Sequence, residues 1–134
     1  MPRNLYVNLP VKDLERSVDF FAALGFSFNP KFTDENATCM IINDSTSVML
    51  LVEPFFATFT RKPIADAHAA TETLLAISVD SRAEVDAMHL HLRAAGARIL
   101  DAPAEYDYTP GYYALFIADP DGLKLELVHE PRLD

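Results

Sequence analysis

Hydrophobic and polar positions follow the same order twice along this chain. Residues 4–11, NLYVNLPV, read as a short strand rich in β-forming residues. In residues 14–24, LERSVDFFAAL, the apolar positions recur at helical spacing, and a glycine follows directly. Turn residues then separate three strand-like runs. These runs cover residues 26–32, 37–43 and 47–53.

The second half repeats this order. Residues 73–80 read as a strand, and Ser81 with Glu84 forms a capping box before a helix over residues 83–95. Three more strand-like runs cover residues 97–101, 112–118 and 123–128. The repeat predicts an α+β fold of two βαβββ units, with the second helix about one turn longer. Each helix would cover one face of a sheet, and the other faces would curve together into a cup.

The whole chain, residues 1–134, is expected to be one domain. The first unit covers about residues 4–53 and the second about 73–130, with a linker over about 54–72. The linker is long, aromatic and irregular, which is typical of a binding loop or a lid. Its phenylalanines fit core or dimer packing better than a stacking platform.

Charge and cysteine content exclude several classes of partner and suggest a location. The 20 acidic and 11 basic residues give a formal net charge of -9. Nucleic acids and anionic membrane surfaces need positive charge, so neither is an expected partner. Cys39 is the single cysteine and is expected to be buried. No apolar run is long enough to cross a bilayer. The expected compartment is the reducing cytoplasm.

Two longer motifs carry a resemblance to a known family. The stretches YVNLPVKDLERSVDFFAALGF and FIADPDGLKLEL resemble the vicinal oxygen chelate superfamily, which includes glyoxalase I, extradiol dioxygenases and bleomycin resistance proteins. The resemblance covers nearly the whole chain and is nearest to small lactoylglutathione lyase-like members. It implies a divalent metal held in the cup by residues from the first and last strand of each unit.

At the four implied ligand positions this chain has Tyr6, Leu50, Leu74 and Glu126. Glu126 is the only good match, because the two leucines have no donor atom and a phenol such as that of Tyr6 binds iron only in some proteins. Zinc, nickel or iron sites of this type need at least three protein ligands. We therefore expect no metal cofactor, and a divalent metal remains the alternative.

The histidines do not complete a metal site. His89 and His91 lie two apart on a helix and point to different sides. His129 lies three residues after Glu126 on a strand, which places it on the opposite face. His68 lies in the linker and would reach the cup only if that loop folds over it.

Glu126 is the candidate catalytic residue, as a base or a hydrogen-bond acceptor; the alternative is a remnant of an ancestral metal site. Strand alternation would bury Leu125 and Leu127 beneath the second helix and turn Glu126 into the cup. Tyr6 and Asn8 share one face of the first strand, where they would orient a substrate or simply pack.

Further candidate ligand contacts are apolar or phenolic. Leu50 and Leu74 are interpreted as apolar lining of the pocket. Tyrosines surround the TPG turn of the second half, and among them Tyr108 and Tyr113 are the candidates for ligand binding. Phenols suit small molecules because they combine an apolar body with a polar tip. The alternative is an exposed hairpin.

The leading hypothesis is a metal-independent protein that binds a small organic molecule in a cup. Such a protein would sequester its ligand or perform simple acid-base chemistry through Glu126. The alternatives are a metal-dependent lactoylglutathione lyase-like or dioxygenase enzyme, and a non-catalytic interaction protein. The resemblance also implies a homodimer. Whether any reaction is catalysed is left open.

Overall fold

The computed structural model describes residues 3–131. By its internal contacts the chain forms two compact units, one ending at Ala65 and the other beginning at Asp66. This boundary lies within the segment predicted as a linker.

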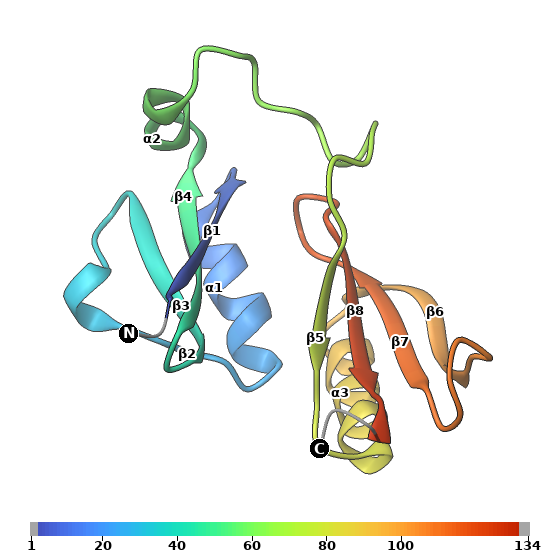
Figure 1. The fold of residues 1–134 in the computed structure, drawn as a ribbon. Coiled ribbons are helices and arrows are strands. Elements are labelled where there is room, and N and C mark those ends of the chain that lie inside the picture. Colours follow the sequence, from blue (N-terminus) through green and yellow to red (C-terminus); the bar gives the residue numbers. More distant parts are fainter. Residues whose placement is uncertain (1–2, 132–134) are drawn as a thin grey trace. The chain divides into compact units, whose positions relative to one another are not determined.

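The first unit contains one four-stranded sheet, one main helix and several short helical turns (Figure 1). In the sheet order β1-β4-β3-β2, β1 pairs with β4 in parallel and the other neighbours are antiparallel. The elements are β1 (Leu5–Val11), α1 (Leu14–Ala23), β2 (Ser27–Phe28), η1 (Pro30–Phe32), β3 (Ala37–Asn43), β4 (Thr46–Val52), α2 (Glu53–Phe56) and η2 (Ala57–Phe59).

The second unit has the same topology, with sheet order β5-β8-β7-β6 and a parallel pairing of β5 with β8. Its helix packs against β6, β7 and β8 on one face of the sheet (Figure 1). The elements are β5 (Leu75–Ser78), α3 (Arg82–Ala94), β6 (Arg98–Glu105), β7 (Tyr113–Ala118) and β8 (Lys124–His129). The predicted α+β class and the two βαβββ units are confirmed. The cup stays a prediction.

Both main helices begin at side-chain caps, and the sequence predicts the one at Ser81. The Asp13 carboxylate accepts the backbone N–H of Arg16, and the Ser81 hydroxyl accepts that of Glu84, each at 3.1 Å. The Glu84 carboxylate accepts the Asp80 N–H instead of that of Ser81. With 10 and 13 residues, α1 and α3 differ by about one turn, as predicted. No helix within residues 3–131 is long and apolar enough to cross a membrane.

Two expectations about local structure were wrong. Residues 26–32 form a two-residue strand followed by a 3-10 turn, because Pro30 begins the turn and the Asn29 side chain accepts the Lys31 N–H at 3.0 Å. The segment after β4 is also not fully irregular, since α2 and η2 extend the chain helically from Glu53 to Phe59. A proline in the first turn of α2 favours this start.

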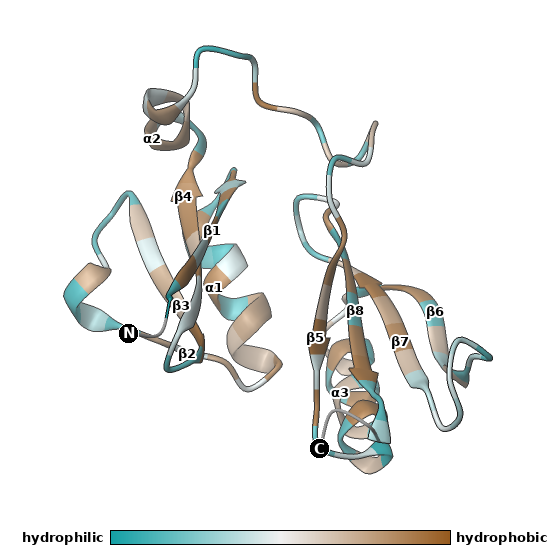
Figure 2. Cartoon of the chain, viewed as in Figure 1, coloured by the Kyte–Doolittle hydropathy of each residue, from teal (hydrophilic) through white to brown (hydrophobic). Residues whose placement is uncertain are grey.

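Each unit buries its own apolar residues between its helix and its sheet. Hydrophobic residues concentrate along β4, β7 and β8 (Figure 2). Fully buried side chains in the first unit include Val11, Phe21, Met40 and Leu50. In the second unit they include Val85, Leu92, Leu115, Ile117, Leu125 and Leu127. Cys39 is buried and free, as predicted.

Candidate functional site

Strand β8 presents a carboxylate on the face of the second sheet that carries no helix. Leu125 and Leu127, 1% and 0% exposed, lie on the face that packs against α3. Successive side chains of a strand alternate between faces, so Glu126 lies on the opposite face, and it is half-buried. We call this surface the helix-free face. The predicted alternation at β8 is therefore what the structure shows.

Register places a row of four residues across this face. Glu126 pairs with Ala76 on β5 and with Phe116 on β7, and Phe116 in turn pairs with Asp101 on β6. Residues directly opposite each other in neighbouring strands point to the same face. On the helix-free face Glu126 thus lies beside an aromatic ring, and Asp101 is opposite that ring at an irregular position of β6.

The Glu126 carboxylate accepts a hydrogen bond from the phenol of Tyr112, which lies just before β7. Burial raises the pKa of Tyr112 well above its ordinary value, and the hydrogen bond and negative charge of Glu126 raise it further. The phenol consequently keeps its proton and remains a donor at neutral pH. A carboxylate has about four acceptor sites, and Tyr112 occupies one of them.

Aromatic rings surround this hydrogen bond. Tyr106 and Tyr108 stack with centroids 5.6 Å apart, and Tyr112 is edge-on to both, at 6.5 Å and 5.1 Å. Tyr106 also meets Phe116 edge-on at 5.5 Å. We call these four residues, Tyr106, Tyr108, Tyr112 and Phe116, the aromatic cluster. Its outermost member, Tyr108, is 64% exposed.

The electrostatic surroundings of the cluster are mainly acidic. Burial raises the pKa of Tyr106, and the negative charge of Asp101, the neighbouring Tyr108 and the charge of Glu126 raise it further. A single cation lies against the cluster among the ring contacts of residues 3–131. It is the Lys124 ammonium, 4.8 Å from the centroid of the Phe116 ring.

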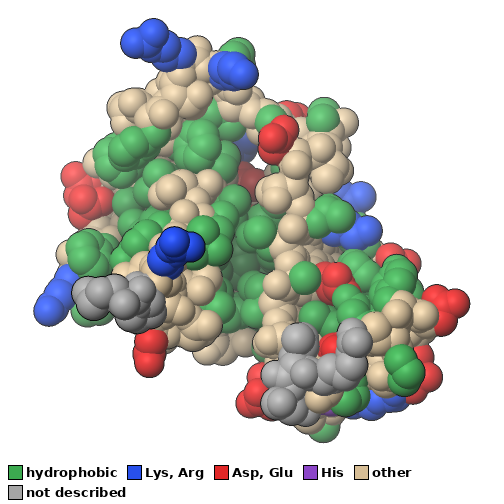
Figure 3. Space-filling model, in the orientation of Figure 1, with side chains coloured by type: hydrophobic (Ala, Val, Ile, Leu, Met, Phe, Trp, Pro, Cys, Tyr) green, Lys and Arg blue, Asp and Glu red, His purple; other side chains and the backbone are tan. Residues whose placement is uncertain are grey.

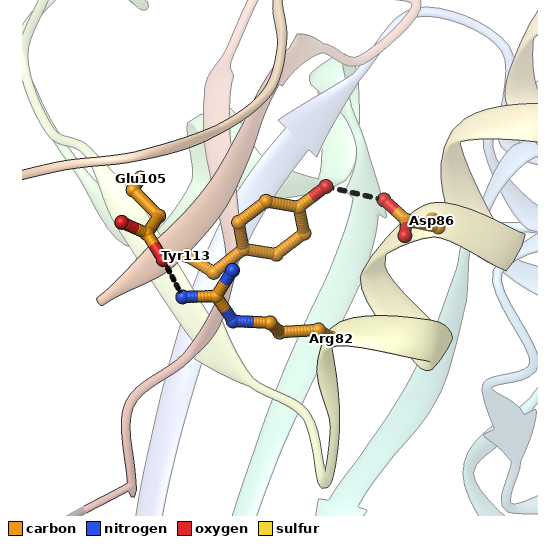
Figure 4. A network of polar contacts seen from close by, with 4 residues as sticks. All are labelled: Arg82, Asp86, Glu105 and Tyr113. Carbon is orange, nitrogen blue, oxygen red and sulfur yellow. Dashed lines mark hydrogen bonds and ion pairs between the residues drawn. The ribbon is translucent and has the colours of Figure 1, made fainter. Parts of the chain in front are cut away.

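Tyr113, the neighbour of Tyr112, points elsewhere and joins a separate polar network (Figure 4). Its hydroxyl donates to the Asp86 carboxylate of α3 at 2.6 Å. The Arg82 guanidinium lies 4.7 Å from the centroid of its ring and pairs with Glu105 of β6. Side chains from α3, β6 and β7 meet here, so this network joins the first turn of α3 to the sheet. Of the two predicted ligand-binding tyrosines, the structure brings Tyr108 but not Tyr113 to the cluster.

His68 of the linker lies against the turn that precedes β8. An added Cβ on Gly122, whose φ is +92°, would lie 2.7 Å from His68 Nδ1 and 2.9 Å from its backbone nitrogen. Asp119 stabilises the turn, because its carboxylate accepts the N–H groups of Asp121 and Leu123, each at 2.9 Å. Burial raises the pKa of Asp119, and these hydrogen bonds oppose the rise. His68 therefore packs on this turn instead of projecting freely.

In the first unit the predicted residues divide between the two faces of the sheet. Tyr6 and Asn8 share one face and are exposed, as alternation predicts. Leu50 differs from its predicted position: it pairs with Leu9 on the other face and is 0% exposed. The residue of β4 that pairs with Asn8 is Met49. A shift of one residue moves a strand side chain to the opposite face.

The internal repeat explains this difference. A Glu-Pro pair follows both last strands, at residues 53–54 and 130–131, and aligning these pairs sets Met49 against Glu126. Leu74, the implied ligand position on the first strand of the second unit, precedes β5 and is 61% exposed. By alternation with Ala76, it belongs to the helix-free side of β5.

These residues do not fit a metal site of the implied type. Leu74 has no donor atom, Met49 offers a soft thioether, and only Glu126 supplies a carboxylate. No group of three or more His, Cys, Asp or Glu side chains able to hold a metal ion occurs in the described part of the chain.

Sequence reasoning named Glu126 and Tyr108 as candidates but missed the contacts that join them through Tyr112. Tyr112 was one of four tyrosines near the TPG turn, and no pattern distinguished it from Tyr113. Phe116 and Lys124 read as ordinary strand residues. The signal available was strand register: once β7 and β8 are paired, Phe116 falls directly opposite Glu126.

Comparison with known families agrees with this architecture. The family model described as the Glyoxalase/Bleomycin resistance protein/Dioxygenase superfamily matches residues 4–127. The chain belongs to this superfamily. The predicted resemblance is thus confirmed, and the superfamily's two-unit fold corresponds to the two repeats seen here.

Several solved structures share the fold of this chain. A glyoxalase-related enzyme from Fulvimarina pelagi is 22% identical with a TM-score of 0.80, covering 98% of this chain and 90% of that one. A hypothetical protein from S. aureus is 24% identical with a TM-score of 0.79, covering 97% and 95%. A lactoylglutathione lyase from Agrobacterium tumefaciens is 17% identical with a TM-score of 0.68, covering 96% and 94%. No protein with curated function matches the chain.

Proposed function

We propose that this superfamily member binds a small organic molecule on the helix-free face of its second unit, without a metal ion. The observation that carries the proposal is the hydrogen bond from Tyr112 to Glu126 inside the aromatic cluster. It orients a carboxylate on a surface that also offers exposed ring area. Small-molecule sites typically combine apolar or aromatic walls with a few well-placed polar groups.

Glu126 is the residue that gives this site its polarity. Its remaining acceptor sites would receive an N–H or O–H group of the ligand, and Tyr112 would hold the carboxylate in place. The rings of the cluster would contact the apolar body of the ligand. Simple acid-base chemistry through Glu126 is compatible with this arrangement, and binding alone requires fewer groups.

A fragment screen in the presence of a chelator tests the proposal. Ligand-observed NMR would identify fragments that bind the full chain in EDTA, and each binder would be measured again with Glu126→Gln. The matched control is Glu105→Gln, which removes an exposed carboxylate outside the helix-free face. We expect Glu126→Gln to weaken most binders and Glu105→Gln to leave them unchanged. Binders that ignore Glu126→Gln, or that need an added divalent ion, would refute the proposal.

The protein is also proposed to be a homodimer in the cytoplasm. Large hydrophobic side chains are exposed in both units, which supports a further buried surface. They include Leu5, Phe32, Phe59, Leu74 and Leu90. Light scattering at micromolar concentration would give twice the mass of the 14.9 kDa chain, and a monomer would contradict the dimer.

A further inference from the structure

The two units differ sharply in charge. Of the 20 acidic and 11 basic residues, the second unit, residues 66–134, holds 13 and 5, so it accounts for -8 of the formal net charge of -9. Acidic side chains lie among hydrophobic ones over its elements (Figure 3). A surface charge of one sign attracts ligands of the opposite sign and repels the others.

Charge of the same sign lies next to the aromatic cluster. Glu126 is hydrogen-bonded to Tyr112, and Asp101 is directly opposite Phe116 in the register. The face of an aromatic ring carries partial negative charge, so ring faces and carboxylates both favour a cation. An anionic ligand would meet unfavourable charge from both.

The protein already places one cation on this cluster. The Lys124 ammonium lies 4.8 Å from the Phe116 centroid, within the range of a cation–π interaction. Phe116 is therefore occupied by an internal cation, whereas Tyr108 keeps most of its surface exposed. The exposed ring available to a ligand is that of Tyr108, beside Tyr106 and Tyr112.

We infer that the ligand of this site is a flat organic cation, such as a quaternary or protonated nitrogen heterocycle. This inference rests on the proposed function and adds the charge and shape of the ligand. The ring system of the ligand stacks on Tyr108, and its positive charge lies toward the carboxylate of Glu126. Lys124 repels the positive charge of the ligand and therefore lowers its affinity.

Three probes of similar shape and different charge test the inference. N-Methylquinolinium is a permanent cation, quinoline is neutral at neutral pH, and quinoline-4-carboxylate is an anion. Each would be titrated into the full chain, and amide shifts in the NMR spectrum would give both the dissociation constant and the binding face. We expect the cation to bind at least about fivefold more tightly than the other two, with affinity that falls as salt is added.

Variants assign this preference to particular side chains. Glu126→Gln and Tyr108→Ala should each weaken N-methylquinolinium by about five- to thirtyfold, the range for a lost ion pair or cation–π contact. Lys124→Met should strengthen it by about two- to fivefold, a gain that misfolding does not produce. Tyr113→Phe, which alters the separate polar network, should have no effect.

The outcomes separate this inference from the proposed function. Absence of N-methylquinolinium binding, or equal or tighter binding of quinoline or its carboxylate, overturns the cation preference. An unchanged or weaker affinity after Lys124→Met overturns it as well. The proposed function fails on different results: fragments of every charge that are indifferent to Glu126→Gln, or fragments that bind only when a divalent ion is added.

Discussion

The hydrogen bond between Tyr112 and Glu126 is the contact that carries the proposed function, and its energy is measurable. Tyr112→Phe removes the hydroxyl and keeps the ring, so the Glu126 carboxylate loses its donor. A hydrogen bond to a charged group contributes about 1.5–3 kcal/mol. Because both residues are only half-buried, we expect a loss near the lower end, about 1.5 kcal/mol.

A double-mutant cycle isolates the part of this interaction that depends on the charge of Glu126. Glu126→Gln keeps an acceptor for the Tyr112 hydroxyl but removes the charge, so its own effect should stay within about 1 kcal/mol. The coupling energy of Tyr112→Phe with Glu126→Gln should be about 0.5–1.5 kcal/mol. Urea unfolding followed by far-UV circular dichroism gives the four free energies. Additive effects, with coupling near zero, would show that the charge of Glu126 does not strengthen the contact.

The same pair determines how stability depends on alkaline pH. The folded protein raises the pKa of Tyr112 above the ordinary value of 10.0, so the unfolded chain releases this proton first as pH rises. The contribution of Tyr112 to stability is complete below pH 10.0 and is lost above it. Tyr112→Phe should therefore reduce the alkaline loss of stability. An identical alkaline profile in the variant would contradict the assigned environment.

Three further substitutions test the supporting structure. Gly122→Ala adds strain at a positive φ and a clash with His68, so it should lower the free energy of unfolding by about 1–3 kcal/mol. Gly25→Ala is the control, because Gly25 has a similar φ and nothing within 4 Å, and it should cost less. Equal losses of stability in thermal melts would refute the packing of His68 against Gly122. Burial raises the pKa of Asp119 in the folded state, so the unfolded chain releases this proton first and the protein loses stability as pH rises just above 3.8. Asp119→Asn should remove this loss. An unchanged dependence of stability on acid pH would contradict the assigned environment. Tyr113→Phe should change the free energy of unfolding by less than about 1 kcal/mol, since its hydroxyl contacts an exposed carboxylate; a larger loss would assign that network a greater role.

The fold was predictable because its signals are local and occur twice. Asp13 and Ser81 mark the two helix starts, and alternation around Glu126 fixes which side of β8 is polar. Each signal needs only a few neighbouring residues. The repeat then constrains the topology, since a second copy of the same order rarely arises in an unrelated fold.

The site was less predictable because it depends on register and turn direction. Leu50 was assigned to the binding face, but pairing with Leu9 sends it to the core and gives that face to Met49. Tyr112 and Tyr113 are adjacent, so alternation places them on opposite sides, and only the observed turn shows which one reaches Glu126. A shift of one residue in register moves each strand side chain to the opposite face, and the sequence alone does not fix the register at these positions.

The central claim is that Glu126 organises metal-independent recognition on the helix-free face. The most direct measurement is amide chemical-shift mapping of bound fragments on the full chain after exhaustive chelation. The account predicts shifts concentrated on β5, β7 and β8 around Glu126, with the same map before and after chelation. Shifts confined to the first unit, or binding that appears only when a divalent ion is restored, would contradict it.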